Sequence, residues 1–89
     1  MSAIAHPAPI RAADTMELER LEGQQRTLSR IRRELHAEID HLYLAAPLDA
    51  AQIERLAELE TQERFVSGRR RAMHREIDEL RVTLGLQPA

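Results

Sequence analysis

Two sets of five polar residues, spaced alike, carry the chemistry that this sequence suggests. The sets are Gln25, Ser29, Arg32, His36 and Asp40, and then Glu63, Ser67, Arg70, His74 and Asp78. An arginine fork can donate two hydrogen bonds to guanine O6 and N7, and an aspartate can accept from guanine N1–H and N2–H. Serine and arginine suit phosphate oxygens, while histidine can stack on a base or donate to it and titrates near neutral pH. Both sets therefore have the chemistry to hold a guanine nucleotide.

The residues around these sets form two apolar stripes with helical spacing. A capping box at Asp14 and Glu17 predicts the start of the first helix, and Pro47 disfavours helix in the residue before it. A second capping box follows at Asp49 and Gln52, and Gly85 with Pro88 ends the second helix. The first stripe is Leu18, Leu21, Leu28, Leu35, Ile39 and Leu42, and the second is Ile53, Leu56, Leu59, Val66, Met73, Ile77, Leu80 and Leu84.

This pattern predicts an all-α protein, an antiparallel two-helix hairpin (coiled coil) with a disordered N-terminal arm. The turn is so short that the helices have to lie side by side in opposite directions. The expected boundaries are a disordered arm over 1–13, a hairpin over 14–85 and a tail over 86–89. Within the hairpin, helix 1 covers about 15–44, the turn 45–48 and helix 2 about 49–84.

The two helices are an internal repeat. Residues 18–44 and 56–82 share thirteen identities in 27 positions when the chain is shifted by 38 residues. Generic heptad helices would share leucines and some charges, but not serine, arginine, histidine and aspartate at fixed offsets. Gene duplication is therefore the better explanation. It makes the two polar sets copies of each other.

The heptad seam is polar at the same two places in each repeat. Gln25 and Arg32 in the first helix, and Glu63 and Arg70 in the second, stand where apolar residues are expected. One polar seam residue can fix register, but two in succession cost more than register control requires, because an unpaired charge in a seam is expensive. The pattern predicts that something polar occupies this part of the seam.

The position of the turn gives a first estimate of which residues face one another. With the turn centred near 45–48, residue n faces roughly residue 92 − n, so that a pseudo-twofold axis crosses near residues 27 and 65. Gln25 and Ser29 would then face Ser67 and Glu63. The two sets would form one surface for an elongated, anionic ligand that is itself twofold symmetric, or for a pair of such molecules.

Both sets resemble the motif E-x3-S-x2-R-x3-Q-x3-D of the RsiG anti-sigma factors, small coiled-coil proteins of spore-forming actinomycetes. Here His36 and His74 replace the motif glutamine, and Gln25 replaces its first glutamate. In that family two motif copies bind an intercalated dimer of cyclic di-GMP, and the loaded hairpin sequesters the sporulation sigma factor WhiG. The resemblance implies that the ten residues bind cyclic di-GMP as a regulatory ligand and that a WhiG-type sigma factor is the partner. Two copies in one chain make a monomer sufficient for the site, and a homodimer stays open.

Other classes of function fit less well. The net charge of −2 argues against direct DNA binding, no apolar run could span a membrane, and we expect a cytoplasmic protein. No metal site is expected, because the two His–Asp pairs are weak and far apart. No enzyme is expected either, because Ser29 and His36 are about 10 Å apart along the helix.

Plainer readings of the polar residues stay open. Arg32 and Arg70 could extend from the seam to solvent, and the histidines and aspartates could be solvated surface. The alternative function is therefore a structural coiled-coil adaptor that self-associates into a helical bundle without nucleotide.

Overall fold

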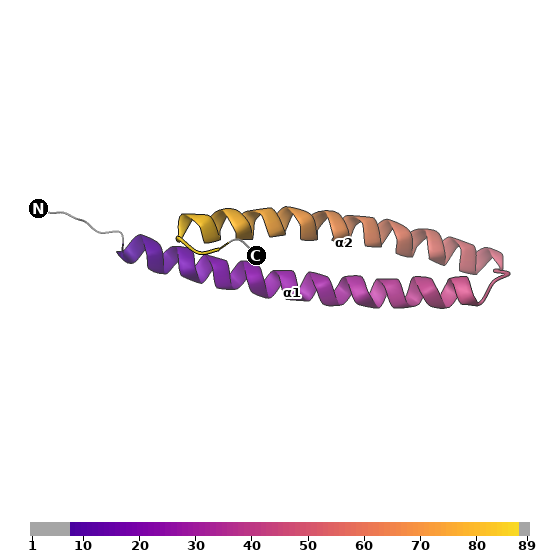
Figure 1. The fold of residues 1–89 in the computed structure, drawn as a ribbon. Helices are drawn as coiled ribbons and strands as arrows, with labels where there is room; N and C mark the ends of the chain where they lie inside the picture. The colour runs from indigo at the N-terminus through magenta and orange to yellow at the C-terminus, as the bar shows by residue number, and fades with distance from the viewer. Residues whose placement is uncertain (1–7, 88–89) are drawn as a thin grey trace, which may run out of the picture.

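Two long helices and a short turn form the described part of the chain. The computed structural model describes the backbone of residues 8–87 and the side chains of residues 13–87. Helix α1 (Ala8–Leu44) and helix α2 (Ala50–Thr83) run antiparallel and pack along their length (Figure 1). The described residues include no strand, so the predicted antiparallel two-helix hairpin is confirmed. Within the same residues, neither helix is long and apolar enough to cross a membrane.

Both ends of α2 follow the sequence signals. The Asp49 carboxylate accepts a hydrogen bond from the Gln52 backbone N–H, and the Gln52 side chain accepts one from the Asp49 N–H. At the other end Gly85 has a φ of 77°, the left-handed conformation that glycine adopts without strain. The Leu86 N–H then donates to the Arg81 carbonyl, as in a Schellman motif. The predicted capping box and the glycine stop of α2 are confirmed.

The start of α1 differs from the prediction. The helix begins at Ala8 rather than near residue 15, so Asp14 lies inside it and does not cap it. Three of the residues from 8 to 13 are alanine, the strongest helix former, and Pro9 stands in the first turn, where its missing N–H costs nothing. The predicted disordered arm over 1–13 was therefore too long. Residues 1–7 of that arm, and residues 88–89 of the tail, lie outside the described residues.

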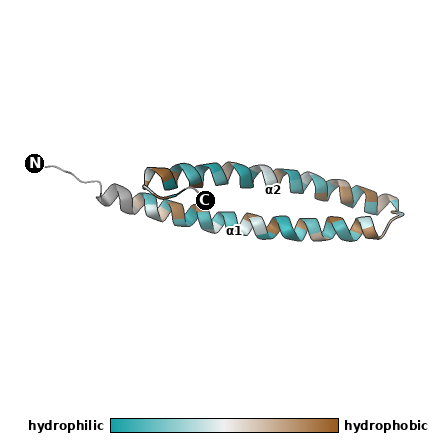
Figure 2. Ribbon diagram, viewed as in Figure 1, coloured by the Kyte–Doolittle hydropathy of each residue, from teal (hydrophilic) through white to brown (hydrophobic). Residues whose placement is uncertain are grey.

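The core consists of two small aliphatic clusters. One cluster contains Leu18, Leu21, Met73 and Ile77, and the other contains Leu35, Leu59 and Val66. A shift of 38 residues relates Leu21 to Leu59 and Leu35 to Met73, so the clusters are copies of one arrangement. Leu28 packs against both. Apolar residues occur only at intervals along each helix, with hydrophilic residues between them (Figure 2).

Ile53 is the residue of the apolar stripes that the prediction placed wrongly. Its side chain is 56% exposed, whereas Leu59 is fully buried. Each three-residue step along a helix falls about 60° short of a full turn. Ile53 is two such steps from Leu59, so it lies about 120° around the helix from Leu59, on a side of α2 that does not face α1.

We predict that Leu59→Ala lowers the free energy of unfolding by about 2–4 kcal/mol, because it opens a cavity in one of only two clusters. Urea titration followed by circular dichroism measures the change. Ile53→Ala is the matched control and should cost less than about 1 kcal/mol. Equal losses in the two variants would contradict the assignment of the core.

Candidate functional site

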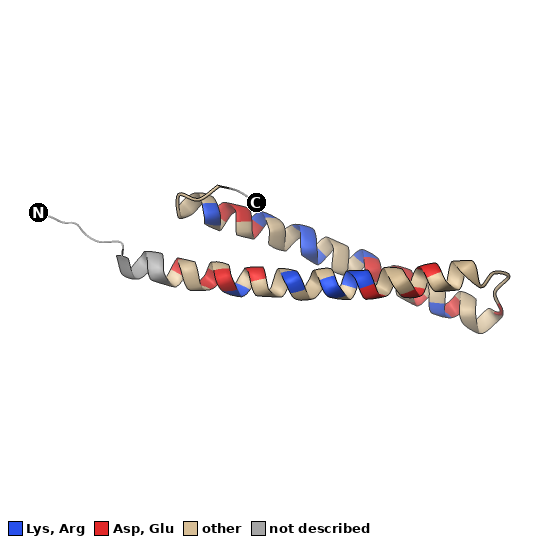
Figure 3. Cartoon of the chain, turned by 60° about the horizontal axis from the view of Figure 1, so that its bottom comes forward, with Lys and Arg blue, Asp and Glu red and all other residues tan. Residues whose placement is uncertain are grey.

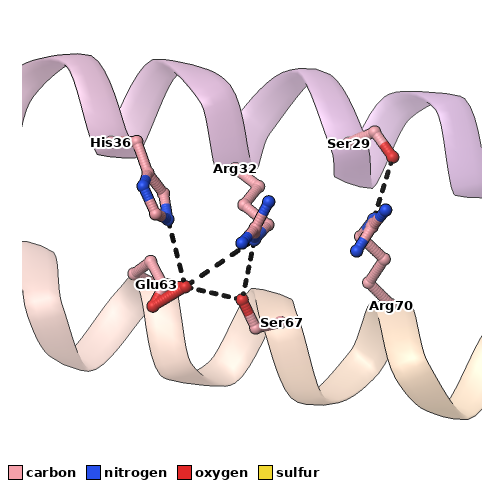
Figure 4. A network of polar contacts seen from close by, with 6 residues as sticks. All are labelled: Ser29, Arg32, His36, Glu63, Ser67 and Arg70. Atoms are coloured by element: carbon pink, nitrogen blue, oxygen red, sulfur yellow. Dashed lines mark hydrogen bonds and ion pairs between the residues drawn. The ribbon is translucent and has the colours of Figure 1, made fainter.

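Two arginine–serine hydrogen bonds cross between the helices where the two core clusters meet. Arg32 Nε donates to Ser67 Oγ over 3.1 Å, and Arg70 Nε donates to Ser29 Oγ over 3.1 Å (Figure 4). The repeat shift of 38 residues converts one contact into the other. In both arginines the recorded hydrogen bond uses Nε alone, so the terminal guanidinium nitrogens have no partner among the described residues.

A second pair of contacts obeys the same pseudo-symmetry. His36 Nε2 lies 3.3 Å from Glu63 Oε1, and Gln25 Nε2 lies 3.3 Å from His74 Nδ1. Ser67 also donates to Glu63 over 2.6 Å. We call Arg32, His36, Glu63 and Ser67 the Arg32 half-site, and Gln25, Ser29, Arg70 and His74 the Arg70 half-site.

The contacts correct the predicted register. In the four contacts that are related in pairs by the repeat, Gln25–His74 with His36–Glu63 and Ser29–Arg70 with Arg32–Ser67, the two residue numbers add up to 99 rather than 92. The predicted pairing of Gln25 and Ser29 with Ser67 and Glu63 was therefore wrong. The pseudo-twofold axis passes between residues 30 and 31 of α1 and between 68 and 69 of α2.

Side-chain direction accounts for this error. Because α1 ends at Leu44 and α2 begins at Ala50, the backbones place opposite each other residues whose numbers add up to about 94. Side chains in a helix lean toward its N-terminus. In an antiparallel pair the two leans run in opposite directions, so long side chains meet partners of higher number. The turn alone does not reveal this shift.

The half-sites lie at the edge of the seam, not at its centre. The Arg32 side chain is 39% exposed and the Glu63 side chain 21% exposed, and none of the described polar residues is fully buried. The sequence predicted that something polar occupies the seam beside the polar positions of the two helices. This prediction holds in part, because each repeat supplies polar side chains that contact the other repeat. Arg32 and Arg70 extend toward solvent as the plainer reading expects, but each is held at Nε.

The two aspartates of the predicted site lie in different surroundings. Asp40 is exposed and has no hydrogen bond or ion pair to any of the eight half-site residues, and Asp78 is half-buried. Each lies one helical turn beyond the histidine of its set. The residues that the structure describes contain no group of three or more histidine and carboxylate side chains that could hold a metal ion.

One further pair of contacts was not predicted from the sequence. Arg81 Nη1 lies 3.4 Å from Glu22 Oε2, and Tyr43 Oη donates to Glu60 Oε2 over 2.8 Å. The shift of 38 residues relates these contacts too. Glu22 and Glu60 are identical in the two repeats, a signal that could have identified them. These contacts continue the pseudo-symmetric flank beyond each half-site, with the glutamates one helical turn from Gln25 and Glu63 and with Tyr43 and Arg81 two turns from the histidines.

Glu63 is the half-site residue whose titration the surroundings change. The hydrogen bond from Ser67, with His36 and Arg32 nearby, holds the pKa of Glu63 below its ordinary value, against a smaller opposing effect of desolvation. A carboxylate with a depressed pKa stabilises the folded state above its unfolded pKa, and this stability is lost as the pH falls through the folded pKa.

We therefore predict that Glu63→Gln removes part of the acid sensitivity of folding. Wild type should lose stability relative to the variant as the pH falls below about 4.5 and through the lower folded pKa. Urea titrations between pH 3 and 7 give the comparison. Glu54→Gln, which removes an exposed carboxylate without an ion pair in the described structure, should follow wild type. A parallel pH dependence of wild type and Glu63→Gln would contradict this role.

Comparison with known proteins adds no relative to this picture. No protein-family model, curated protein or solved structure matches the chain.

Proposed function

We propose that the hairpin is a cyclic di-GMP-binding module of the RsiG type, an anti-sigma factor that sequesters a WhiG-type sigma factor when loaded. The observation that carries this proposal is the pair of half-sites related by a pseudo-twofold axis. Cyclic di-GMP has the same symmetry, with two guanines and two phosphates. A symmetric ligand, or a stacked pair of such ligands, can make equivalent contacts with both half-sites.

The two arginine side chains are oriented for a planar or anionic ligand. Each guanidinium is fixed at Nε by a serine hydroxyl, which leaves its terminal nitrogens free to donate to guanine O6 and N7 or to a phosphate. Asp40 and Asp78, one turn beyond the histidines, would accept from the Watson–Crick edge of guanine. Adenine does not offer N1–H and N2–H together, so these carboxylates favour guanine.

Positive charge gathers where the half-sites lie. Nine of the thirteen arginines fall between residues 26 and 33 of α1 and between 64 and 75 of α2, segments that face each other across the seam. On α1 the arginines occupy the middle of the helix, and acidic residues lie on either side of them (Figure 3). A chain with a net charge of −2 thus has a cationic centre. Such a distribution attracts a compact dianion better than it attracts a long polyanion.

A second function, self-association as a structural adaptor, is favoured by an exposed aromatic ring. Phe65 is 70% exposed on α2. Its repeat equivalent, Thr27, lines an open groove together with Gly23, Leu28 and Met73. A protruding ring and a groove at equivalent positions could pack against a second copy. This surface does not use the half-sites, so nucleotide binding separates the two functions.

We predict that calorimetric titration with cyclic di-GMP shows saturable binding of about two nucleotides per hairpin. Cyclic di-AMP and GTP, tested in parallel at pH 6 and pH 8, should bind at least about tenfold more weakly, because they lack the guanine pair or the symmetry. Equal affinities for the three nucleotides would contradict guanine recognition.

The anti-sigma role has its own test. Size-exclusion chromatography with a WhiG-type sigma factor should give a complex with cyclic di-GMP and none without it, since the ligand can only shift binding by favouring the competent state. A complex that forms equally well without nucleotide would contradict nucleotide-dependent sequestration.

A further inference from the structure

The two half-sites differ in residue type at one position. Glu63 of the Arg32 half-site corresponds to Gln25 of the Arg70 half-site. The Glu63 carboxylate lies 3.3 Å from His36 and 3.8 Å from Arg32 Nε, so it places a negative charge beside the Arg32 guanidinium. Gln25 contacts His74 through a neutral amide. The Arg32 half-site therefore contains a built-in anion, and the Arg70 half-site does not.

Arginines next to the half-sites increase the difference in charge between them. Arg70, Arg71, His74 and Arg75 line one shallow pocket on α2. The equivalent positions on α1 hold Arg32, Arg33, His36 and Ala37, so one arginine is missing there. Within the described residues, Arg70, Arg71 and Arg75 form no ion pair.

Counted over the half-site residues, the α2 pocket residues and their α1 equivalents, the charge difference between the half-sites is two units. Each has an aspartate one turn beyond its histidine, Asp40 or Asp78, so the aspartates do not distinguish them. What remains is one extra arginine at the Arg70 half-site and one extra carboxylate at the Arg32 half-site. The Gln25 Oε1 atom is also buried without a hydrogen-bond partner. A donor from a bound ligand could satisfy it.

We propose that the half-sites are unequal and fill in order, and that the phosphate of an anionic ligand binds first at the Arg70 half-site. This ordering rests on the proposed nucleotide function and adds a regulatory property to it. The second ligand has to displace Glu63 from Arg32 and His36, or bind beside its negative charge. Occupation of the Arg32 half-site, and with it the complete loaded surface, then requires a higher nucleotide concentration than the first step.

Nuclear magnetic resonance of the arginine Nε–Hε groups can follow the two half-sites separately. Both Nε–H groups donate to a serine, which favours slow exchange and visible signals. We would titrate the protein with cyclic di-GMP and, separately, with inorganic pyrophosphate. The Arg70 and Ser29 signals should shift at lower ligand concentration than those of Arg32 and Ser67.

Two isosteric variants provide matched controls. Glu63→Gln should strengthen the second step by about threefold or more, and Gln25→Glu should weaken the first step by a similar factor, as expected for one unit charge about 6 Å away in water. Each variant makes the two half-sites alike at this position, so each should bring the two steps closer together.

The outcomes separate this proposal from the proposed function. Simultaneous shifts at both half-sites, or earlier shifts at Arg32, would overturn the ordering while cyclic di-GMP binding stands. Earlier shifts at Arg70 with pyrophosphate but none with cyclic di-GMP would support the ordering and overturn the nucleotide function. No shift with either probe would overturn both.

Discussion

Two arginines at the edge of a two-helix seam, halfway along its length, are the constraint on which this structure depends. A hairpin has no third element to cover them, so they have to reach water or find partners on the opposite helix. The two arginines do both. Each arginine side chain is half-exposed, and its Nε donates a hydrogen bond to a serine of the other repeat. The aliphatic clusters on either side then hold the helices in the register that these hydrogen bonds require.

Duplication explains why one arrangement appears twice. In an antiparallel hairpin built from two similar helices, any contact between positions i and j is accompanied by a contact between their repeat equivalents. The pairs Arg32–Ser67 and Ser29–Arg70, and Glu22–Arg81 and Tyr43–Glu60, follow this rule. The rule concerns geometry and not identity, so a substitution such as glutamine for glutamate at position 25 can make the two halves chemically unequal. A symmetric framework can thus contain two chemically unequal half-sites.

Much of the fold could be predicted from local signals, because they act over a few residues. The capping box at Asp49, the left-handed Gly85 and the leucine spacing each depend on near neighbours. The start of α1 could not be predicted in this way. The capping signal at Asp14 competes with a preceding alanine-rich stretch, which extends the helix toward the N-terminus. The pairing of residues between the two polar sets could not be predicted either, because it depends on the direction in which long side chains lean across the seam. Their spacing identified the eight residues that meet, and the partner of each came from the structure.

In the free hairpin the serines and Glu63 are the partners that a ligand would partly replace. The free energy of binding is then the difference between two sets of hydrogen bonds, plus the gain from neutralising the central arginines. The serines hold the arginines near one orientation, so less side-chain entropy is lost when a ligand binds. Under the proposed function, the polar interruption of the seam lowers the stability of the free protein and serves ligand binding.

The most direct test of that claim is the free energy of unfolding of Arg32→Leu/Arg70→Leu, measured with and without cyclic di-GMP. We expect the variant to be more stable than wild type without ligand, by about 1–2 kcal/mol, because the seam becomes apolar. At a ligand concentration of about 100 times Kd, wild type should gain at least about 2.7 kcal/mol and the variant nothing. Arg20→Leu/Arg55→Leu, which changes two arginines outside both half-sites and outside the cationic centre, removes the same charge and should keep the ligand response. A ligand response retained by Arg32→Leu/Arg70→Leu, or lacking in wild type, would contradict the account.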